Sequence, residues 1–286
     1  EGLWVGAEFA DIESTLEHTA QPSKGERVCV REILCAFVGV MSASSSTSQP
    51  SSRKHALAAS LSPPVLRDWC AFINQTEARD KFSKVIQYAS RFVAWYFRER
   101  GNRVVSERFE GLFVGMSQAR KLFRLFKTVQ EYQKFIDLFN GKSQEDLFDW
   151  TLSVIKQLGM MDYWAVENVG TLSKVGFLGF NPASFTKIAT GGWFVALVAQ
   201  LAKDSRALVR TFTSDGEKSQ DNRRRQQARK AAVLGILKSC GDLITASNGI
   251  ELPLRLFGRQ FSEGAVGLGG LTSALLTLYG LWPARK

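Results

Sequence analysis

An uninterrupted apolar segment near the C-terminus limits this chain to a small set of folds. Residues 264–284 (GAVGLGGLTSALLTLYGLWPA) contain 21 consecutive positions without a charged side chain. A transmembrane helix needs about 20 such residues, and aromatic side chains favour the membrane surface. Tyr279 and Trp282 lie near one end, and Arg285 and Lys286 follow. The segment therefore predicts a transmembrane helix, with the buried helix of a soluble core as the alternative.

A second apolar stretch precedes it. Residues 188–202 carry no charge, and only Lys187 separates them from the apolar residues 175–186. Together they are a marginal candidate for another span. Between residues 65 and 181 there is no proline, which permits long helices. We therefore predict an all-α, membrane-associated helical protein with amphipathic helices and one or two transmembrane helices.

Composition divides the chain into three parts. Residues 1–64 include the Ser-rich stretch SASSSTSQPSS and end at a Pro-Pro pair, so we expect a low-complexity, disordered N-terminal extension. Residues 65–159 form an amphipathic helical region. Residues 160–286 form a membrane-embedded helical region with a polar loop at 203–230.

Helical periodicity is clear in the middle region. Within residues 66–100, apolar side chains recur on one face and polar side chains, including Lys84 and Gln87, on the other. The pairs at 101–102 and 140–141 (GN and NG) predict helix ends. A helix over 143–158 is expected to begin at Ser143 and to end at Gly159.

The scarcity of histidine argues against enzymatic chemistry. Downstream of residue 55 there is none, so His-dependent nucleophilic and metal chemistry is not available to the main body. The cysteines form no CxxC pair, and no glycine-rich stretch has phosphate-loop spacing. We therefore expect no catalytic residues, no metal site, no cofactor and no enzyme. The histidines and cysteines are His18, His55, Cys29, Cys35, Cys70 and Cys240.

The net charge of +10 indicates an anionic partner, either phospholipid or nucleic acid. The basic run RRRQQARK at 223–230 could contact nucleic-acid phosphates. No zinc-finger, RNA-binding or basic-zipper pattern accompanies this run. We therefore expect an anionic membrane and no nucleic acid.

Residues 116–139 predict a basic amphipathic helix, a type that inserts its apolar face at the membrane surface. The alternative is an ordinary helix of a soluble bundle with its basic face in water. One half carries Ala119, Leu122, Phe123, Phe126, Val129 and Ile136, and the other carries Arg120, Arg124, Lys127, Glu131 and Lys134, with Lys121 at its edge.

Small residues recur at four-residue spacing in the C-terminal apolar segment. Such spacing permits close helix approach in lipid, and it predicts an oligomerisation surface. The residues are Ala265, Gly269 and Ser273 in one row, and Gly270 and Ala274 in another.

Four stretches resemble one known family in the same order along the chain. NQTEARDKFSKVIQYASRFVAWYF (74–97) and GMSQARKLFRLFKTVQEYQKF (115–135) are similar to the opening and membrane-remodelling helices of the peroxisomal membrane-elongation peroxins, numbered as the eleventh peroxin. DYWAVENVGTLSKVGFLG (162–179) and residues 238–283 resemble later parts of that family. Residues 1–64 have no recognised counterpart in that family, and residues 203–230 match it poorly.

The resemblance implies a location in the peroxisomal membrane, self-association, membrane elongation and tubulation, and recruitment of a fission machinery that includes a dynamin-type GTPase. It also leaves open a pore for small metabolites. A soluble helical scaffold is the remaining alternative. By match to the family, the apolar wedge is Ala119, Leu122, Phe123, Phe126 and Val129, and the lipid-facing cations are Arg120, Lys121, Arg124, Lys127 and Lys134.

Overall fold

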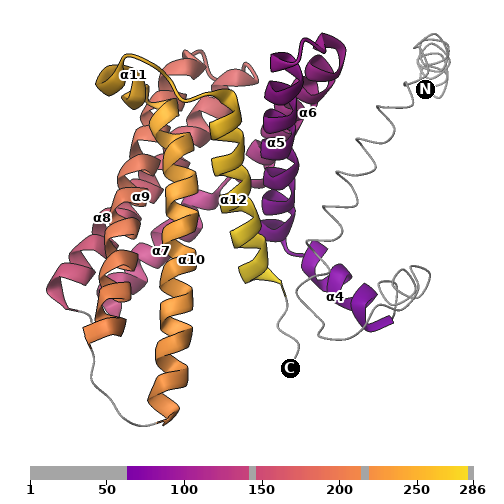
Figure 1. The fold of residues 1–286 in the computed structure, drawn as a ribbon. Coiled ribbons are helices and arrows are strands. Elements are labelled where there is room, and N and C mark those ends of the chain that lie inside the picture. The colour runs from indigo at the N-terminus through magenta and orange to yellow at the C-terminus, as the bar shows by residue number, and fades with distance from the viewer. Residues whose placement is uncertain (1–62, 142–145, 214–218, 283–286) are drawn as a thin grey trace, which may run out of the picture. The chain divides into compact units, whose positions relative to one another are not determined.

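The computed structural model describes residues 63–141, 146–213 and 219–282 (Figure 1). The chain divides into two units, Glu1–Arg67 and Asp68–Lys286. The extension expected at 1–64 lies outside the described residues, apart from the two prolines that open the first described helix.

All regular elements in the described ranges are helices, which confirms the all-α prediction. The helices are α4 (Pro63–Ile73), α5 (Thr76–Glu99), α6 (Arg103–Phe123), α7 (Lys127–Asn140), α8 (Leu147–Lys174), α9 (Pro182–Thr213), α10 (Ser219–Gly249), α11 (Leu252–Phe257) and α12 (Glu263–Leu281).

The turn between α5 and α6 lies where the sequence predicts it. Gly101 adopts a φ of 77°, a left-handed conformation that glycine tolerates without strain. The Asn102 side chain then accepts a hydrogen bond from the Val105 backbone N–H at 3.2 Å and caps α6. The helix end predicted at 140–141 is also confirmed, because α7 ends at Asn140.

The helix end predicted at Gly159 is wrong, because α8 continues to Lys174. Gly159 serves close helix packing instead of termination. A β-carbon at this position would lie 2.6 Å from the carbonyl oxygen of Gly192 in α9. The predicted start at Ser143 lies outside the described residues.

The polar loop predicted at 203–230 is also wrong. Helix α9 extends to Thr213 and α10 begins at Ser219, so most of this stretch is helical. Ion pairs hold the polar end of α9 against the start of α8. Arg206 donates to Asp146 at 2.8 Å and to Asp149 at 2.9 Å, and Arg210 also pairs with both carboxylates.

Six long helices pack into a bundle through consecutive and distant neighbours. α5 packs on α6, α8 on α9 and α9 on α10, while α12 lies between α5 and α10 (Figure 1). The shorter α7 packs on α8. At the end where α11 follows α10, Lys187 pairs with Glu251 at 2.9 Å and lowers the pKa of that carboxyl.

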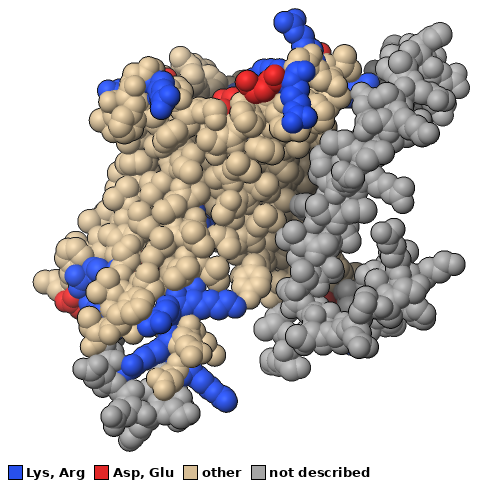
Figure 2. Space-filling view, viewed as in Figure 1, with Lys and Arg blue, Asp and Glu red and all other residues tan. Residues whose placement is uncertain are grey.

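This bundle buries many polar side chains and exposes many large apolar ones, which is unusual for a soluble protein. On α5 the polar side chains Lys84, Gln87 and Ser90 are buried, whereas Phe92 and Val93 on its apolar face are partly exposed. Figure 2 shows charged side chains gathered toward two ends of the face viewed, with a broad uncharged band between. Lipid solvates such a band, whereas a soluble monomer rarely exposes one. This surface argues against the soluble scaffold.

Two of the described helices are long and apolar enough to cross a membrane. They are α9, Pro182–Thr213, and α12, Glu263–Leu281. Both coincide with apolar segments identified in the sequence, and their number agrees with the predicted one or two spans. Ser262 caps α12 by accepting a hydrogen bond from the Ala265 backbone N–H at 3.1 Å.

Candidate functional site

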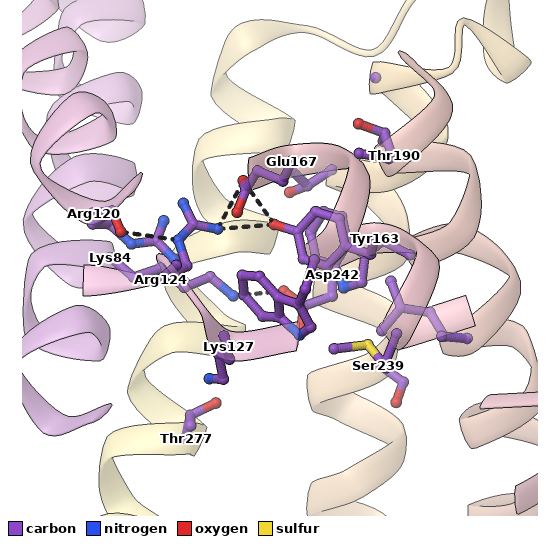
Figure 3. Close-up of a pocket in the computed structure, with 18 of the residues that line it drawn as sticks. Lys84, Arg120, Arg124, Lys127, Tyr163, Glu167, Thr190, Ser239, Asp242 and Thr277 are labelled. Carbon is purple, nitrogen blue, oxygen red and sulfur yellow. Dashed lines mark hydrogen bonds and ion pairs between the residues drawn. The ribbon is translucent and has the colours of Figure 1, made fainter. Parts of the chain in front are cut away.

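A polar cavity of about 740 Å³ lies inside the bundle (Figure 3). Side chains from α5 through α10 and from α12 line it, so segments far apart in the sequence meet there. Its volume falls within the range of small-molecule sites, about 300–1,000 Å³. The cavity is therefore the candidate functional site.

Two buried arginines form one wall. Arg120 donates to Asp80 at 3.0 Å and to Gln87 at 2.5 Å. Arg124 donates to the Tyr163 hydroxyl at 2.8 Å and pairs with Glu167 at 3.1 Å (Figure 3). These contacts satisfy charges that would be costly to leave unpaired away from water.

A buried lysine and aspartate join α5 to α10. The Lys84 ammonium lies 2.7 Å from Asp242 and donates to the Ser273 hydroxyl of α12 at 2.9 Å. Lys238 reaches the same aspartate at 3.7 Å from a more exposed position. One charge cluster thus connects three helices that cover different parts of the sequence.

Trp164 and Glu131 organise the wall nearest α7. The Lys127 ammonium lies 4.9 Å from the centre of the Trp164 ring, and the Arg124 guanidinium lies 5.5 Å from it, both in cation–π geometry. Glu131 accepts a hydrogen bond from the Gln157 side chain at 2.8 Å and pairs with Lys134 at the same distance.

Positive charge prevails in the cavity. Its described lining includes ten Lys or Arg side chains and five Asp or Glu side chains. Asp80 and Glu263 pair with lining arginines without being part of the lining. Even with these two carboxylates, the cations remain in excess, so the arrangement favours an anionic ligand.

No group of three or more His, Cys, Asp or Glu side chains in the described ranges has the geometry of a metal site. The residues that line the cavity are mainly Lys, Arg, Thr, Ser and aromatic side chains. Such groups bind anions and hydroxylated molecules through hydrogen bonds.

The structure corrects the predicted lipid-facing cations. Arg120 and Arg124 are only 6% and 7% exposed, so they do not face lipid phosphates in this fold. Their side chains instead reach partners inside the bundle, as described above. The stretch 116–139 is also not one helix. α6 ends at Phe123 and α7 starts at Lys127, while Phe126 between them has a φ of 61°.

The remaining predicted cations lie nearer the surface. Lys134 is exposed, and Lys121 and Lys127 are half-buried beside the cavity that they line. The apolar wedge is placed outward, apart from half-buried Ala119. Its exposed members are Leu122, Phe123, Phe126 and Val129.

The predicted oligomerisation surface is used within the chain. Gly269 packs against Gly241 of α10, and Gly270 packs against the Tyr88 ring of α5. Ser273 and Ala274 are fully buried, and Ala265 is half-buried. The small residues therefore let α12 approach two helices of its own bundle, and they do not form a free surface for a second copy.

The sequence reading missed the acidic and aromatic members of the site. Asp242, Tyr163, Trp164 and Glu167 had no assigned role, although each lies in a predominantly helical stretch. One sequence pattern that points to the site is the polar face of the α5 stretch, which carries both Lys84 and Gln87. An isolated carboxylate in an apolar stretch, such as Asp242 in GILKSCGDLI, is another.

Comparison with known proteins gives a consistent result. The profile of the family described as peroxisomal biogenesis factor 11 matches residues 66–282. The peroxisomal membrane protein 11 homolog of Dictyostelium discoideum is 26% identical, over 73% of this chain and 91% of its own length. Peroxisomal membrane protein 11E of Arabidopsis thaliana is 27% identical, over 75% and 90%. Human peroxisomal membrane protein 11C is 23% identical, over 70% and 88%.

No solved structure matches this chain. The family match covers the whole described bundle, including the cavity and the region of the apolar wedge. It also agrees with the resemblance seen in the sequence and with the two candidate spans. The chain therefore belongs to the peroxisomal biogenesis factor 11 family and is a peroxisomal membrane protein with a role in peroxisome biogenesis.

Proposed function

We propose that this protein elongates the peroxisomal membrane and promotes its division by inserting the apolar wedge at the α6–α7 break into one leaflet. Insertion on one side expands that leaflet and favours curvature. The observation that carries the proposal is the outward position of four large apolar side chains at this break. Leu122 is 65% exposed, Phe126 77% and Val129 67%, with Phe123 beside them.

The backbone at the break supports the same proposal. Phe126 occupies the left-handed region, where a bulky residue is strained by about 1–3 kcal/mol. Strain of this kind persists where the surrounding structure imposes it, and it often marks a functional position. Here it accompanies an aromatic side chain that points away from the bundle.

The proposed partners follow from this mechanism. Anionic phospholipid is the first, attracted by the exposed Lys134 and by the half-buried Lys121 and Lys127. A second copy of the chain adds curvature by self-association, through exposed apolar surface in place of the buried small residues of α12. The fission machinery, including a dynamin-type GTPase, would act on the tubules that result.

Replacing wedge residues tests the mechanism in the full-length chain. In anionic vesicles, we expect Phe123→Glu and Phe126→Glu to abolish tubulation seen by negative-stain electron microscopy, because a carboxylate opposes insertion. Phe126→Gly tests the wedge more specifically, because it separates loss of the ring from damage to the fold. Glycine accepts the left-handed backbone, so the fold should be retained or stabilised while the inserted ring is lost.

Phe177→Glu is the matched control. Phe177 is also 77% exposed, but it lies between α8 and α9 and is not one of the wedge residues. This variant should tubulate vesicles as well as the unchanged protein does. The wedge mechanism is wrong if all three wedge variants tubulate vesicles undiminished, or if the control loses tubulation to the same extent as they do.

A pore for small metabolites is the second candidate, and the polar cavity favours it. A cavity with excess positive charge inside an apolar bundle resembles the interior of a selective pathway. In planar bilayers we expect conductance with a preference for anions. Lys156→Glu, in the cavity lining, should shift the reversal potential toward cation selectivity, whereas Lys230→Glu, outside it, should not. No conductance, or an unchanged reversal potential for Lys156→Glu, would remove this candidate.

A further inference from the structure

We propose that the cavity is a binding site for an organic anion that carries several negative charges together with hydroxyl groups, as sugar phosphates do. This inference goes beyond both membrane shaping and conduction. A site of this kind could be occupied whether or not the ligand crosses the membrane.

The first support is unneutralised positive charge. Among the ten cations of the lining, Lys121 and Lys156 form no ion pair with another described residue. Lys156 also feels the positive charges of Lys203 and Lys238, which outweigh the negative charges of the Asp204 and Glu131 carboxylates. Like charges held together away from bulk water repel strongly, and a bound anion would offset that repulsion.

The second support is a set of buried polar atoms without hydrogen-bond partners. Within the described ranges there are four such side-chain atoms, and all four belong to residues that line this cavity. Native proteins leave few such groups, so their concentration around one cavity indicates ligand contacts. They are Trp164 Nε1, Glu167 Oε2, Asp204 Oδ2 and Thr245 Oγ1.

The chemistry of these four atoms narrows the ligand class. The Trp164 N–H can only donate, so it suits a phosphate or carboxylate oxygen. The oxygens of Glu167 and Asp204 accept, and they repel a bare anion. A ligand hydroxyl can donate to them, while Thr245 can do either. A molecule with anionic groups and several hydroxyls satisfies the whole set, whereas hydrogen phosphate offers only one hydroxyl for two carboxylate oxygens on different helices.

The placement of the cations favours a ligand that carries more than one anionic group. Lys121 belongs to α6, Lys156 to α8 and Lys238 to α10, so positive charge lines several walls of the cavity. Its volume of about 740 Å³ accommodates a ligand with several functional groups. Fructose 1,6-bisphosphate, which has two phosphates and three hydroxyls on its ring form, is therefore a suitable probe.

The experiment is a titration of the full-length, detergent-solubilised protein with fructose 1,6-bisphosphate at constant ionic strength. Trp164 and Trp193 line the cavity, so intrinsic fluorescence reports occupancy, and calorimetry provides the affinity. We expect the bisphosphate to bind at least about 10-fold more tightly than inorganic phosphate or fructose, because only it meets both requirements.

Three variants locate the site. Lys156→Gln with Lys238→Gln should weaken binding by about 10-fold or more, since each removes a cation but leaves Asp242 paired with Lys84. Trp164→Phe keeps an aromatic side chain but removes the unpartnered N–H together with the five-membered part of the indole, so a loss of about fivefold is expected. Lys230→Gln removes an exposed cation outside the cavity and should leave the dissociation constant unchanged.

Binding is measured on solubilised protein, which neither tubulates a membrane nor conducts ions. The result therefore tests ligand binding separately from the proposed membrane shaping and from the pore. Absence of binding overturns it. Equal affinity for inorganic phosphate, or equal weakening by Lys230→Gln, shows attraction to surface charge only and also overturns it. Wild-type affinity in both Trp164→Phe and the double lysine variant places binding elsewhere and has the same consequence.

Discussion

Lys84→Met is expected to destabilise the protein by about 3–5 kcal/mol, the cost of breaking a buried ion pair. Lys84 and Asp242 are both buried, and their charged atoms lie 2.7 Å apart. Methionine fills similar space but leaves the carboxylate with Lys238 at 3.7 Å as its only cation, beside a hydrogen bond with Ser273. Thermal unfolding in detergent, followed by tryptophan fluorescence, should show a large decrease in the melting temperature.

Two further variants show whether the charge is the cause. Lys84→Met combined with Asp242→Leu removes both charges, so it should recover most of the lost stability. Lys238→Met removes only the partly exposed partner and should cost less than about 1 kcal/mol. If the double variant is as unstable as Lys84→Met, the loss comes from packing and the ion pair contributes little.

The helices themselves follow from local sequence. The Gly-Asn pair at 101–102 and the uncharged segment at 264–284 each predict an element that the structure contains. Helical periodicity over 66–100 predicts helix correctly, but the structure divides this stretch into α4 and α5. These signals are local because capping, turn conformation and apolar length depend on neighbouring residues. The family resemblance depends on the same stretches.

The orientation of the helices could not be read in this way. Periodicity identifies two faces of a helix, but it does not state whether water or lipid surrounds the bundle. Arg120 and Arg124 therefore fit the pattern of lipid-facing cations, although both are buried. Their partners include Asp80 and Tyr163, each about 40 residues away along the chain, and no local pattern reports such pairs.

Glycine is ambiguous for a related reason. Gly159 fits a helix end as well as a close contact, and only the position of α9 decides between them. The same holds for Gly269, whose spacing suits contact with a second chain or with another helix of the same chain. In both cases the deciding neighbour, Gly192 or Gly241, comes from a distant part of the sequence.

Gly269→Leu should disrupt the bundle itself. A β-carbon at Gly269 would lie 2.8 Å from the carbonyl oxygen of Gly241, and backbone cannot move aside as a flexible side chain can. Leucine would force α12 away from α10 and disturb the nearby Lys84–Ser273 hydrogen bond. We expect a loss of at least about 1–3 kcal/mol, measured by thermal unfolding.

Gly280→Leu provides the control on the same helix, because a β-carbon there would meet no atom within 4 Å. Its stability should stay within about 0.5 kcal/mol of the unchanged protein. The dependence on protein concentration then separates contact within the chain from contact between chains. A Gly269→Leu protein that is less stable at every concentration has lost packing inside the bundle. If Gly269→Leu instead keeps its melting temperature and only changes its oligomeric state, the small residues of α12 form a contact between chains, and the prediction of packing within the bundle is wrong.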